Sequence, residues 1–334
     1  MPSPTDRFDR PIRDLRISVT DRCNFRCTYC MPKELFGKDH EFLPRTDLLS
    51  FEEIAVIVAA FVQRGAEKVR ITGGEPLLRK GIEDLIAMIS GIEGVRDLTL
   101  TTNGSLLVRK AESLAAAGLN RVTVSLDAVD EKTFQKMNDV GFPVSAVLDA
   151  IEVAASAGLG PIKINCVVQK GVNDHAVPEM AAHFKGTGHI VRFIEYMDVG
   201  TTNGWRLDDV LPASEIIEMI HEIHPVEPLA PNYPGEVANR FRYLDGDGEV
   251  GVIASVTKPF CGSCTRARVS AEGSLYTCLF ASKGEDLRGA IRSGIDVGEV
   301  IDRVWSDRDD RYSEIRSSQT VRIGAPVEMS YIGG

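Results

Sequence analysis

The sequence predicts an α/β fold in which short strands alternate with longer helices around a parallel sheet. Between residues 12 and 200, β-rich runs recur, and amphipathic stretches of helical period separate them. Most of the connections between these runs are about 20–35 residues long, enough for the helical crossovers that parallel strands require. With 43% hydrophobic and 26% charged residues, the composition is that of a globular protein and excludes a disordered or fibrous chain.

Six strands are expected in this part of the chain, at residues 15–20, 68–72, 98–102, 121–126, 162–168 and 189–196. The helical stretches between and after them are residues 50–64, 79–91, 105–117, 144–158 and 175–185. Six β/α units are two short of the eight that close a TIM barrel. We therefore expect an incomplete (β/α)6 TIM-like barrel.

The pattern changes after about residue 200. A helix is expected near 213–223, and four prolines within 225–234 predict an irregular connector after it. Short strand-like runs at 240–244, 250–256 and 266–270 follow, with helical patterns near 284–292 and 296–305. We expect two domains: residues 1–240 form the partial barrel, and residues 241–334 form a smaller α+β domain that closes the barrel mouth.

The charge balance limits the partners. Lys and Arg total 38 against 48 Asp and Glu, a net charge of −10, which argues against a protein whose main role is to coat nucleic acid or an anionic membrane. No apolar run approaches the roughly 18 residues of a membrane span, and residues 1–14 lack the apolar core of a signal peptide. We expect a soluble, cytoplasmic protein with no membrane or nucleic-acid partner.

The seven cysteines cannot all pair with one another, and a reducing compartment favours metal binding or catalysis over disulfides. They fall into one triplet near the start of the chain, one near its end, and Cys166, which is expected to be a small buried hydrophobe. The triplets are Cys23, Cys27 and Cys30, and Cys261, Cys264 and Cys278.

The first triplet, C-x3-C-x2-C, follows the first predicted strand at its carboxyl end, where α/β proteins place active sites. This spacing lets one short loop bind an iron–sulfur cluster through three thiolates and leave one iron without a protein ligand. A zinc site is the alternative. It would need a fourth ligand such as His40, and structural zinc sites usually present paired cysteines instead.

The string RCNFRCTYCMP (22–32) resembles the signature of the radical S-adenosylmethionine (SAM) superfamily. The resemblance implies a 4Fe–4S cluster on the first triplet with SAM on its open iron, and Tyr29 matches the aromatic residue before the third cysteine. Thr72–Pro76 resembles the superfamily's GGEP segment, which places Gly74 at the SAM amino group. On its own, this segment also fits a glycine turn before a proline-initiated helix.

Ser125 ends the fourth predicted strand and resembles the superfamily's SAM-facing serine. The alternative is that it caps a helix expected at 130–138.

The second triplet has the spacing C-x2-C-x13-C. The last histidine of the chain is His224, so no local histidine completes a zinc site, but spacing alone leaves zinc and iron both open. Arg266 and Arg268 lie between its cysteines and point to one face of a strand. Residues 250–271 contain no acidic residue, which predicts a local anion site. A solvated strand face is the alternative.

The two triplets, the string FCGSCTRARV (260–269) and the terminal Gly333-Gly334 together resemble one branch of this superfamily, the GTP 3′,8-cyclases of molybdenum cofactor biosynthesis, from Leu15 to Gly334. The resemblance implies conversion of GTP to (8S)-3′,8-cyclo-7,8-dihydroguanosine 5′-triphosphate. A 5′-deoxyadenosyl radical removes hydrogen from ribose C3′, and the carbon radical attacks guanine C8. It also implies a second 4Fe–4S cluster on the second triplet, facing guanine, and a glycine tail that enters the pocket. Arg266, Arg268, Gly333 and Gly334 would assist catalysis.

The substrate needs several inward cations, because a triphosphate carries about four negative charges. Candidate GTP ligands that match family positions are Arg16, Arg70, Thr101, Lys163, Arg192, Arg266 and Arg268. Met197 matches a position that contacts SAM. The alternative for each cation alone is a solvent-exposed charge. The alternative for Thr101 and Met197 is packing at the end of a strand. The implied partners are an electron donor and, downstream, cyclic pyranopterin monophosphate synthase; a homodimer is a possible assembly.

Two other functions would also use cysteine triplets. Another radical SAM enzyme with an auxiliary cluster, such as a peptide-modifying maturase, usually has more cysteines than this chain has left and lacks the paired arginines. The second is a non-enzymatic zinc or iron–sulfur protein. Such a protein would leave the strand-end residues Gly74, Glu75 and Ser125 without a function.

Overall fold

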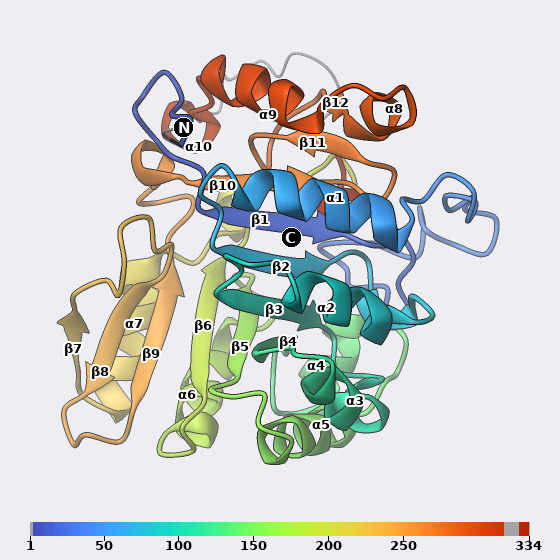
Figure 1. Ribbon diagram of the computed structural model, residues 1–334. Helices are drawn as coiled ribbons and strands as arrows, with labels where there is room; N and C mark the ends of the chain where they lie inside the picture. The colour runs from blue at the N-terminus through green and yellow to red at the C-terminus, as the bar shows by residue number, and fades with distance from the viewer. Residues whose placement is uncertain (1–2, 317–326, 334) are drawn as a thin grey trace.

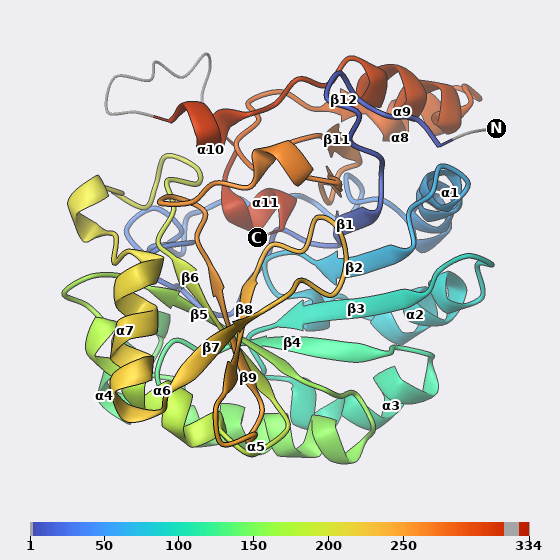
Figure 2. The same cartoon turned by 90° about the vertical axis from the view of Figure 1, so that its left-hand side faces the viewer.

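The computed structural model describes residues 3–316 and 327–333 of the 334-residue chain (Figure 1). Six parallel strands form the middle of one curved sheet: β1 Asp14–Ser18, β2 Lys68–Thr72, β3 Asp97–Thr102, β4 Arg121–Ser125, β5 Lys163–Val168 and β6 Ile190–Glu195. The helices between and after them are α1 Phe51–Val62, α2 Ile82–Ser90, α3 Ala111–Ala116, α4 Glu131–Asn138, α5 Val144–Ser156 and α6 Val177–Phe184. Figure 2 shows these helices outside an open barrel of strands. The expected strands agree with the observed ones to within two residues at each end, so the incomplete (β/α)6 barrel is confirmed.

Local sequence accounts for these elements. At the start of α1, the Ser50 hydroxyl accepts a hydrogen bond from the Glu53 amide (3.1 Å) and the Glu53 carboxylate accepts one from the Ser50 amide (2.8 Å), forming a capping box. The helix buries Ile54, Ile57, Val58 and Phe61 against the sheet. The strands alternate: β2 and β3 bury Val69, Ile71, Leu98 and Leu100 on the face that the helices cover, and the residues between them are polar and belong to the other face.

The C-terminal part of the chain extends the same sheet at both edges. Strand β10 (Arg266–Val269) pairs in parallel with β1, and β9 (Glu249–Ile253) pairs in parallel with β6. Antiparallel strands follow on each side: β11 Ser274–Tyr276 and β12 Glu285–Asp286 beyond β10, and β8 Asn239–Tyr243 and β7 Val226–Leu229 beyond β9. The described part of the sheet therefore has eight consecutive parallel strands, and residues from both ends of the chain form its inner face.

The remaining helices cover the new edges. Helix α7 (Ala213–Ile223) packs on α6, and α8 (Leu287–Arg292) and α9 (Val297–Ser306) pack beside α1 (Figure 1). Of two short helices, α10 (Tyr312–Ile315) contacts the turn at Cys261–Ser263, and α11 (Met329–Ile332) contacts β1 and lies near the centre of Figure 2. No described helix has the length and apolar character needed to span a bilayer.

The prediction of an irregular connector at 225–234 is wrong for its first part, because Val226–Leu229 forms β7. Proline lacks an amide donor and is tolerated in a strand at a sheet edge, which is where β7 lies. Pro228 is therefore compatible with the pairing of β7 with β8.

The buried face of α1 generates a stability prediction. Ile57 is fully buried, whereas its neighbour Val56 is 49% exposed. Ile57→Ala should lower the free energy of unfolding by about 2–5 kcal/mol because it leaves a cavity, while Val56→Ala should change it by about 0.5 kcal/mol or less. Urea unfolding of the metal-free protein followed by circular dichroism measures both. Equal losses in the two variants would contradict the assigned face.

Candidate active site

One cavity on the inner side of the sheet is lined by cysteines of both triplets. The first triplet follows the carboxyl end of β1, whereas Cys264 precedes the amino end of β10. Because β1 and β10 run parallel, the two triplets lie at opposite ends of these strands. Strand β11 runs antiparallel to β10 and returns Cys278 to the end where Cys264 lies. The cavity thus extends along about one strand length, roughly 15 Å, between two groups of thiols.

The first triplet sits in a loop that its own backbone and one arginine hold in shape. The amides of Cys30 and Met31 both donate to the Cys27 carbonyl (2.9 Å each). The guanidinium of Arg26 donates to the carbonyls of Cys23 (2.8 Å) and Phe25 (2.7 Å). The three cysteines therefore present their side chains to the cavity from a fixed turn.

These thiols suit an iron–sulfur cluster. Burial, with Glu75 adding to it, raises the pKa of Cys23 to about 11, and burial raises the pKa of Cys27 and Cys30 above its ordinary range. Without a metal these thiols are protonated at neutral pH, and a cationic cluster would stabilise their thiolate forms. His40, the alternative zinc ligand, packs instead between Phe36 and Phe42.

The GGEP segment packs directly on the cysteine loop. The Gly74 amide donates to the Thr20 carbonyl and the Glu75 amide to the Arg22 carbonyl (2.8 Å each). A Cβ at Gly74 would overlap the Arg22 carbonyl group, so only glycine allows this approach. The backbone at Gly74 is therefore brought against the loop and lines the cavity.

Glu75 has a structural role that sequence reasoning missed. Its carboxylate accepts hydrogen bonds from the Thr102 hydroxyl (2.8 Å) and from the amides of Asn103 (2.8 Å) and Leu77 (3.0 Å). Burial raises the pKa of Glu75 to about 7 despite these bonds. Glu75 thereby ties the end of β2 to the end of β3, and Asn103 lies 3.8 Å from the sulfur of Cys23.

The other expected SAM ligands also line the cavity: Tyr29, Ser125 and Met197. Asp130, rather than Ser125, caps α4 by accepting from the Thr133 amide (2.8 Å), so the capping role considered for Ser125 is excluded. The Tyr29 hydroxyl donates to Asp127 (3.0 Å), a second buried carboxylate whose position the sequence did not reveal.

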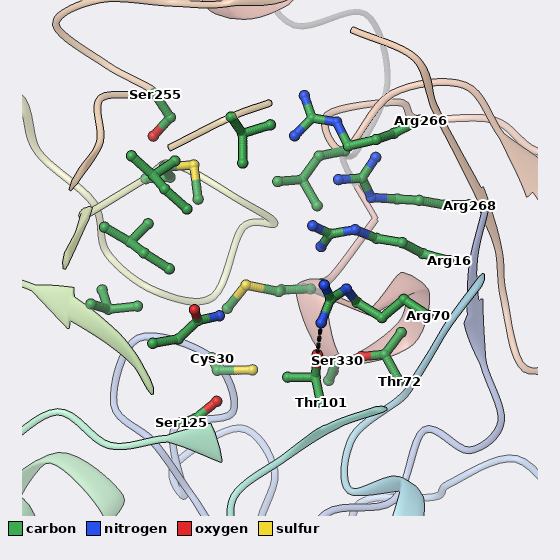
Figure 3. Close-up of a pocket in the computed structure, with 18 of the residues that line it drawn as sticks. Arg16, Cys30, Arg70, Thr72, Thr101, Ser125, Ser255, Arg266, Arg268 and Ser330 are labelled. Atoms are coloured by element: carbon green, nitrogen blue, oxygen red, sulfur yellow. Dashed lines mark hydrogen bonds between the residues drawn. The ribbon is translucent and has the colours of Figure 1, made fainter. Parts of the chain in front are cut away.

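A row of arginines crosses the middle of the cavity (Figure 3). Arg16 on β1 is the Cα partner of Arg70 on β2 and of Arg268 on β10, so the three side chains lie next to one another on one face. Burial, followed by the repulsion of Arg266, lowers the pKa of Arg268 to about 10, and burial lowers the pKa of Arg70 to about 10. Arg16 is shifted in the same direction by burial, then by Arg268 and Arg70, which lower its pKa.

These cations have few anionic partners. Arg70 donates to the hydroxyls of Thr101 and Thr123 (3.0 Å each), and Arg192 donates to the amide oxygen of Asn165 (2.7 and 3.0 Å). Nε of Arg268 is buried without a hydrogen-bond partner among the described residues. Buried, uncompensated positive charge is costly, so this face is suited to a polyanion.

The expected GTP ligands are brought together with one exception. The cavity is lined by Arg16, Arg70, Thr101, Arg192, Arg266 and Arg268. Lys163 lies on β5, outside this lining. Burial and then the nearby Arg192 lower the pKa of Lys163 to about 7, so it still feels the field of the arginines.

The second triplet differs from the first in its charge environment. Arg266 donates from Nε (3.4 Å) and Nη2 (3.2 Å) to the sulfur of Cys264. Burial would raise the pKa of Cys264, but Arg266 and Arg308 outweigh it and lower the pKa to about 6. Burial, with Asp310 adding to it, raises the pKa of Cys278 to about 11. Arg266 therefore contacts a cluster-ligand candidate as well as the cavity, which its alternation with Arg268 did not indicate.

The C-terminal tail reaches the same cavity through Met329 and Ser330 of α11. The Glu328 carboxylate holds it by accepting from the Thr201 amide and hydroxyl (2.9 Å each) and from the Thr202 hydroxyl (2.7 Å). Gly333 has a φ of +71° and lies so close to Thr72 that a Cβ would overlap the threonine methyl group. Gly334 lies outside the described residues.

Cys166 is buried on β5, with its thiol 3.6 Å from the Asp127 carbonyl, as expected for a packing residue. Among the described residues, no three or more Cys, His, Asp or Glu side chains converge as the ligands of a single metal ion do.

Comparison with known proteins agrees with this geometry. Residues 17–184 match the family model of the radical SAM superfamily, and residues 189–314 match that of Molybdenum Cofactor Synthesis C. A solved structure of Streptococcus suis SuiB bound to S-adenosylmethionine shares the fold, with a TM-score of 0.64 at 16% identity over 93% of this chain and 69% of that chain. The chain belongs to the radical SAM superfamily.

Curated relatives narrow this assignment. A protein from Acidothermus cellulolyticus is 54% identical, one from Xanthomonas axonopodis pv. citri 51% and one from Staphylococcus epidermidis 48%, each over 98% of both chains. All three are named GTP 3′,8-cyclase. Within the superfamily, this chain is a member of the GTP 3′,8-cyclase family.

The charge around Cys264 generates a pH prediction for the metal-free protein. The thiolate is the form that reacts, and a pKa of about 6 makes Cys264 mostly thiolate at pH 7. Iodoacetamide should therefore label Cys264 at pH 7 before Cys23 or Cys278, whose pKa values are about 11. The labelling rate of Cys264 should fall about tenfold per pH unit below pH 6, and Arg266→Met should lower this rate at pH 7. Mass spectrometry of labelled peptides measures the rates; equal rates at pH 7 would contradict the lowered pKa.

Proposed function

We propose that this chain converts GTP to (8S)-3′,8-cyclo-7,8-dihydroguanosine 5′-triphosphate, the first step of molybdenum cofactor biosynthesis. The observation that carries the proposal is the row of buried arginines between two cysteine triplets in one cavity. Such a site fits a nucleoside triphosphate: the base would meet the second cluster, and the triphosphate would pair with the arginines between the two triplets.

The residues present fit two 4Fe–4S clusters and SAM, the cofactors of this family. Cys23, Cys27 and Cys30 would hold the first cluster, and the second triplet would hold the other. When bound, the first cluster and SAM supply a one-electron cleavage that gives a radical able to remove hydrogen from carbon. Anaerobic reconstitution should give about eight irons per chain; four irons with one zinc would contradict the second cluster.

The buried arginines would bind the triphosphate of GTP. Arg16, Arg70 and Arg268 present adjoining guanidinium groups to a triphosphate, and each pairing with phosphate relieves their mutual repulsion. With the triphosphate fixed, the ribose lies within the cavity rather than in solvent. Restricting the position of C3′ in this way is what a reactive radical requires, because such a radical takes any hydrogen close to it.

Other residues would contact SAM or keep water out of the cavity. Gly74, Tyr29, Ser125 and Met197 would contact SAM, since all four line the cavity beside the first triplet or at strand ends. The tail held by Glu328 covers one side of the cavity and would exclude water from it. Arg266, Arg268 and the two terminal glycines would assist catalysis.

We further propose a domain division, a cellular location and partners for this chain. The barrel domain would comprise residues 1–240 and the GTP-binding domain residues 241–334. The protein would work in the cytoplasm, receive its electron from an external donor, pass its product to cyclic pyranopterin monophosphate synthase, and form a homodimer. The requirement for an electron with each SAM cleaved supports the donor.

The function is tested by anaerobic incubation with SAM, a reductant and, in turn, GTP, ATP or a peptide. With GTP we expect 5′-deoxyadenosine and a cyclised nucleotide, detected by mass spectrometry. A product from the peptide and none from GTP would favour a peptide-modifying enzyme instead.

The arginine row generates a binding prediction. Arg266→Ala and Arg268→Ala should lose GTP binding by calorimetry while still cleaving SAM slowly, because the first triplet is distant from both. Arg242→Ala removes an exposed arginine paired with Glu227 and is the matched control. Unchanged GTP affinity in both cavity variants would overturn the phosphate site.

The tail generates a second prediction. Deleting Gly333 and Gly334 should leave both clusters bound, as measured by iron content, and abolish cyclisation. Gly333→Ala should weaken cyclisation too, because a side chain there would displace the tail from Thr72. A fully active deletion variant would show that the tail has no part in the reaction.

A further inference from the structure

A buried ion network joins the N-terminal segment to the second triplet. Asp6 accepts from Nε of Arg10 (2.6 Å) and from Nη1 of Arg308 (3.1 Å). The three side chains are at most 2% exposed, although they are charged. Trp305 lies against Arg308, with the guanidinium carbon 4.6 Å from the centre of the ring, and its indole donates to the Arg10 carbonyl (2.9 Å).

The two arginines reach beyond Asp6 to the backbone of the cysteine loop. Nη1 of Arg10 donates to the Cys261 carbonyl (2.6 Å), and Nη1 of Arg308 donates to the Cys264 carbonyl (2.7 Å). One carboxylate thus fixes two guanidinium groups, and each group fixes the carbonyl of one cysteine. Arg10 also donates to the Asp310 carbonyl (3.0 Å), which ties the loop to the segment after α9.

We propose that Asp6, Arg10 and Arg308 form a clamp that positions the Cys261–Cys264 loop to bind the second cluster. The inference rests on the proposed function, because it assumes that this loop carries a cluster.

Two physical arguments support the clamp. Burying three charges is expensive, and a pair of apolar side chains would join the segments at lower cost, so the charges are explained better by a positional task. A guanidinium is a planar group with donors in fixed directions, and it can hold an anion and a carbonyl at once. Here the carbonyls belong to a short turn whose shape sets the directions of both sulfurs.

A clamp and a general stabilising contact predict different results. Loss of a clamp releases the Cys261–Cys264 loop and leaves the first triplet, at the other end of the strands, unchanged. Loss of a general contact between chain segments affects both triplets together, because both depend on the same sheet.

The test compares Arg10→Met with Arg7→Met. Arg7 lies in the same segment with an exposed side chain near Asp307 and Asp309, so its replacement removes the same charge without touching the loop. In the metal-free protein we measure alkylation of Cys261, the cysteine whose carbonyl receives Arg10, relative to Cys27 and Cys30. In the reconstituted protein we measure iron content, the electron paramagnetic resonance signal of each cluster, and SAM cleavage without GTP.

We expect Arg10→Met to speed alkylation of Cys261 several-fold relative to the first triplet. It should also reduce iron toward half, change the signal of the second cluster and leave SAM cleavage intact, with Arg7→Met like wild type. Equal increases at all cysteines, or no change at Cys261, would overturn the clamp. If Arg10→Met fails to fold, Arg10→Lys is measured in the same way. Lysine keeps the positive charge but lacks the planar guanidinium that donates to Asp6 and to the Cys261 carbonyl together. The alkylation result does not depend on GTP turnover, so failure of the clamp and failure of the proposed function are distinguishable.

Discussion

The parallel pairing of β10 with β1 is the constraint on which the site depends. It sets Arg268 beside Arg16, whose other neighbour is Arg70 on β2, so three arginines from distant parts of the sequence share one face. It also decides that the two cysteine triplets face each other along the strand direction instead of meeting at one edge. A barrel closed by its own six units alone would contain neither the second triplet nor the full row of cations.

This arrangement stores unfavourable electrostatics in the middle of the protein. The pKa values of Arg16 and Arg268 are lowered first by burial and then by neighbouring arginines, and apolar packing such as that of Val69 and Leu100 on the neighbouring strands holds these side chains in place. The net charge of −10 lies mostly elsewhere. The acidic exterior and the cationic interior are therefore separate properties, and the average charge describes only the first.

The sequence was sufficient for features that depend on local pattern. The six strands, most helices and the cysteine spacing follow from periodicity and motifs within short windows. The sequence did not predict which strands pair at the edges of the barrel, because the pairing of β9 with β6 and of β10 with β1 joins residues far apart in the chain. Pro228 suggested a connector and instead lies in an edge strand, since the cost of proline depends on neighbours that a sequence does not show. Asp6 and Arg308 are ordinary charged residues in the sequence, and only the structure shows that they are buried and paired. The domain boundary at residue 240 stays a prediction, as do the assignments of single residues to SAM and GTP.

The position of β10 in the chain also has a consequence for biogenesis. Strand β1 is complete once residue 18 has been made, but the ribosome must add about 250 more residues before β10 exists, which takes roughly 12–50 s at ordinary rates of synthesis. During that interval β1 is an open sheet edge with unpaired backbone groups, the kind of surface that aggregates. Closure of this edge is a long-range step, and the cavity therefore forms only after most of the polypeptide has been made.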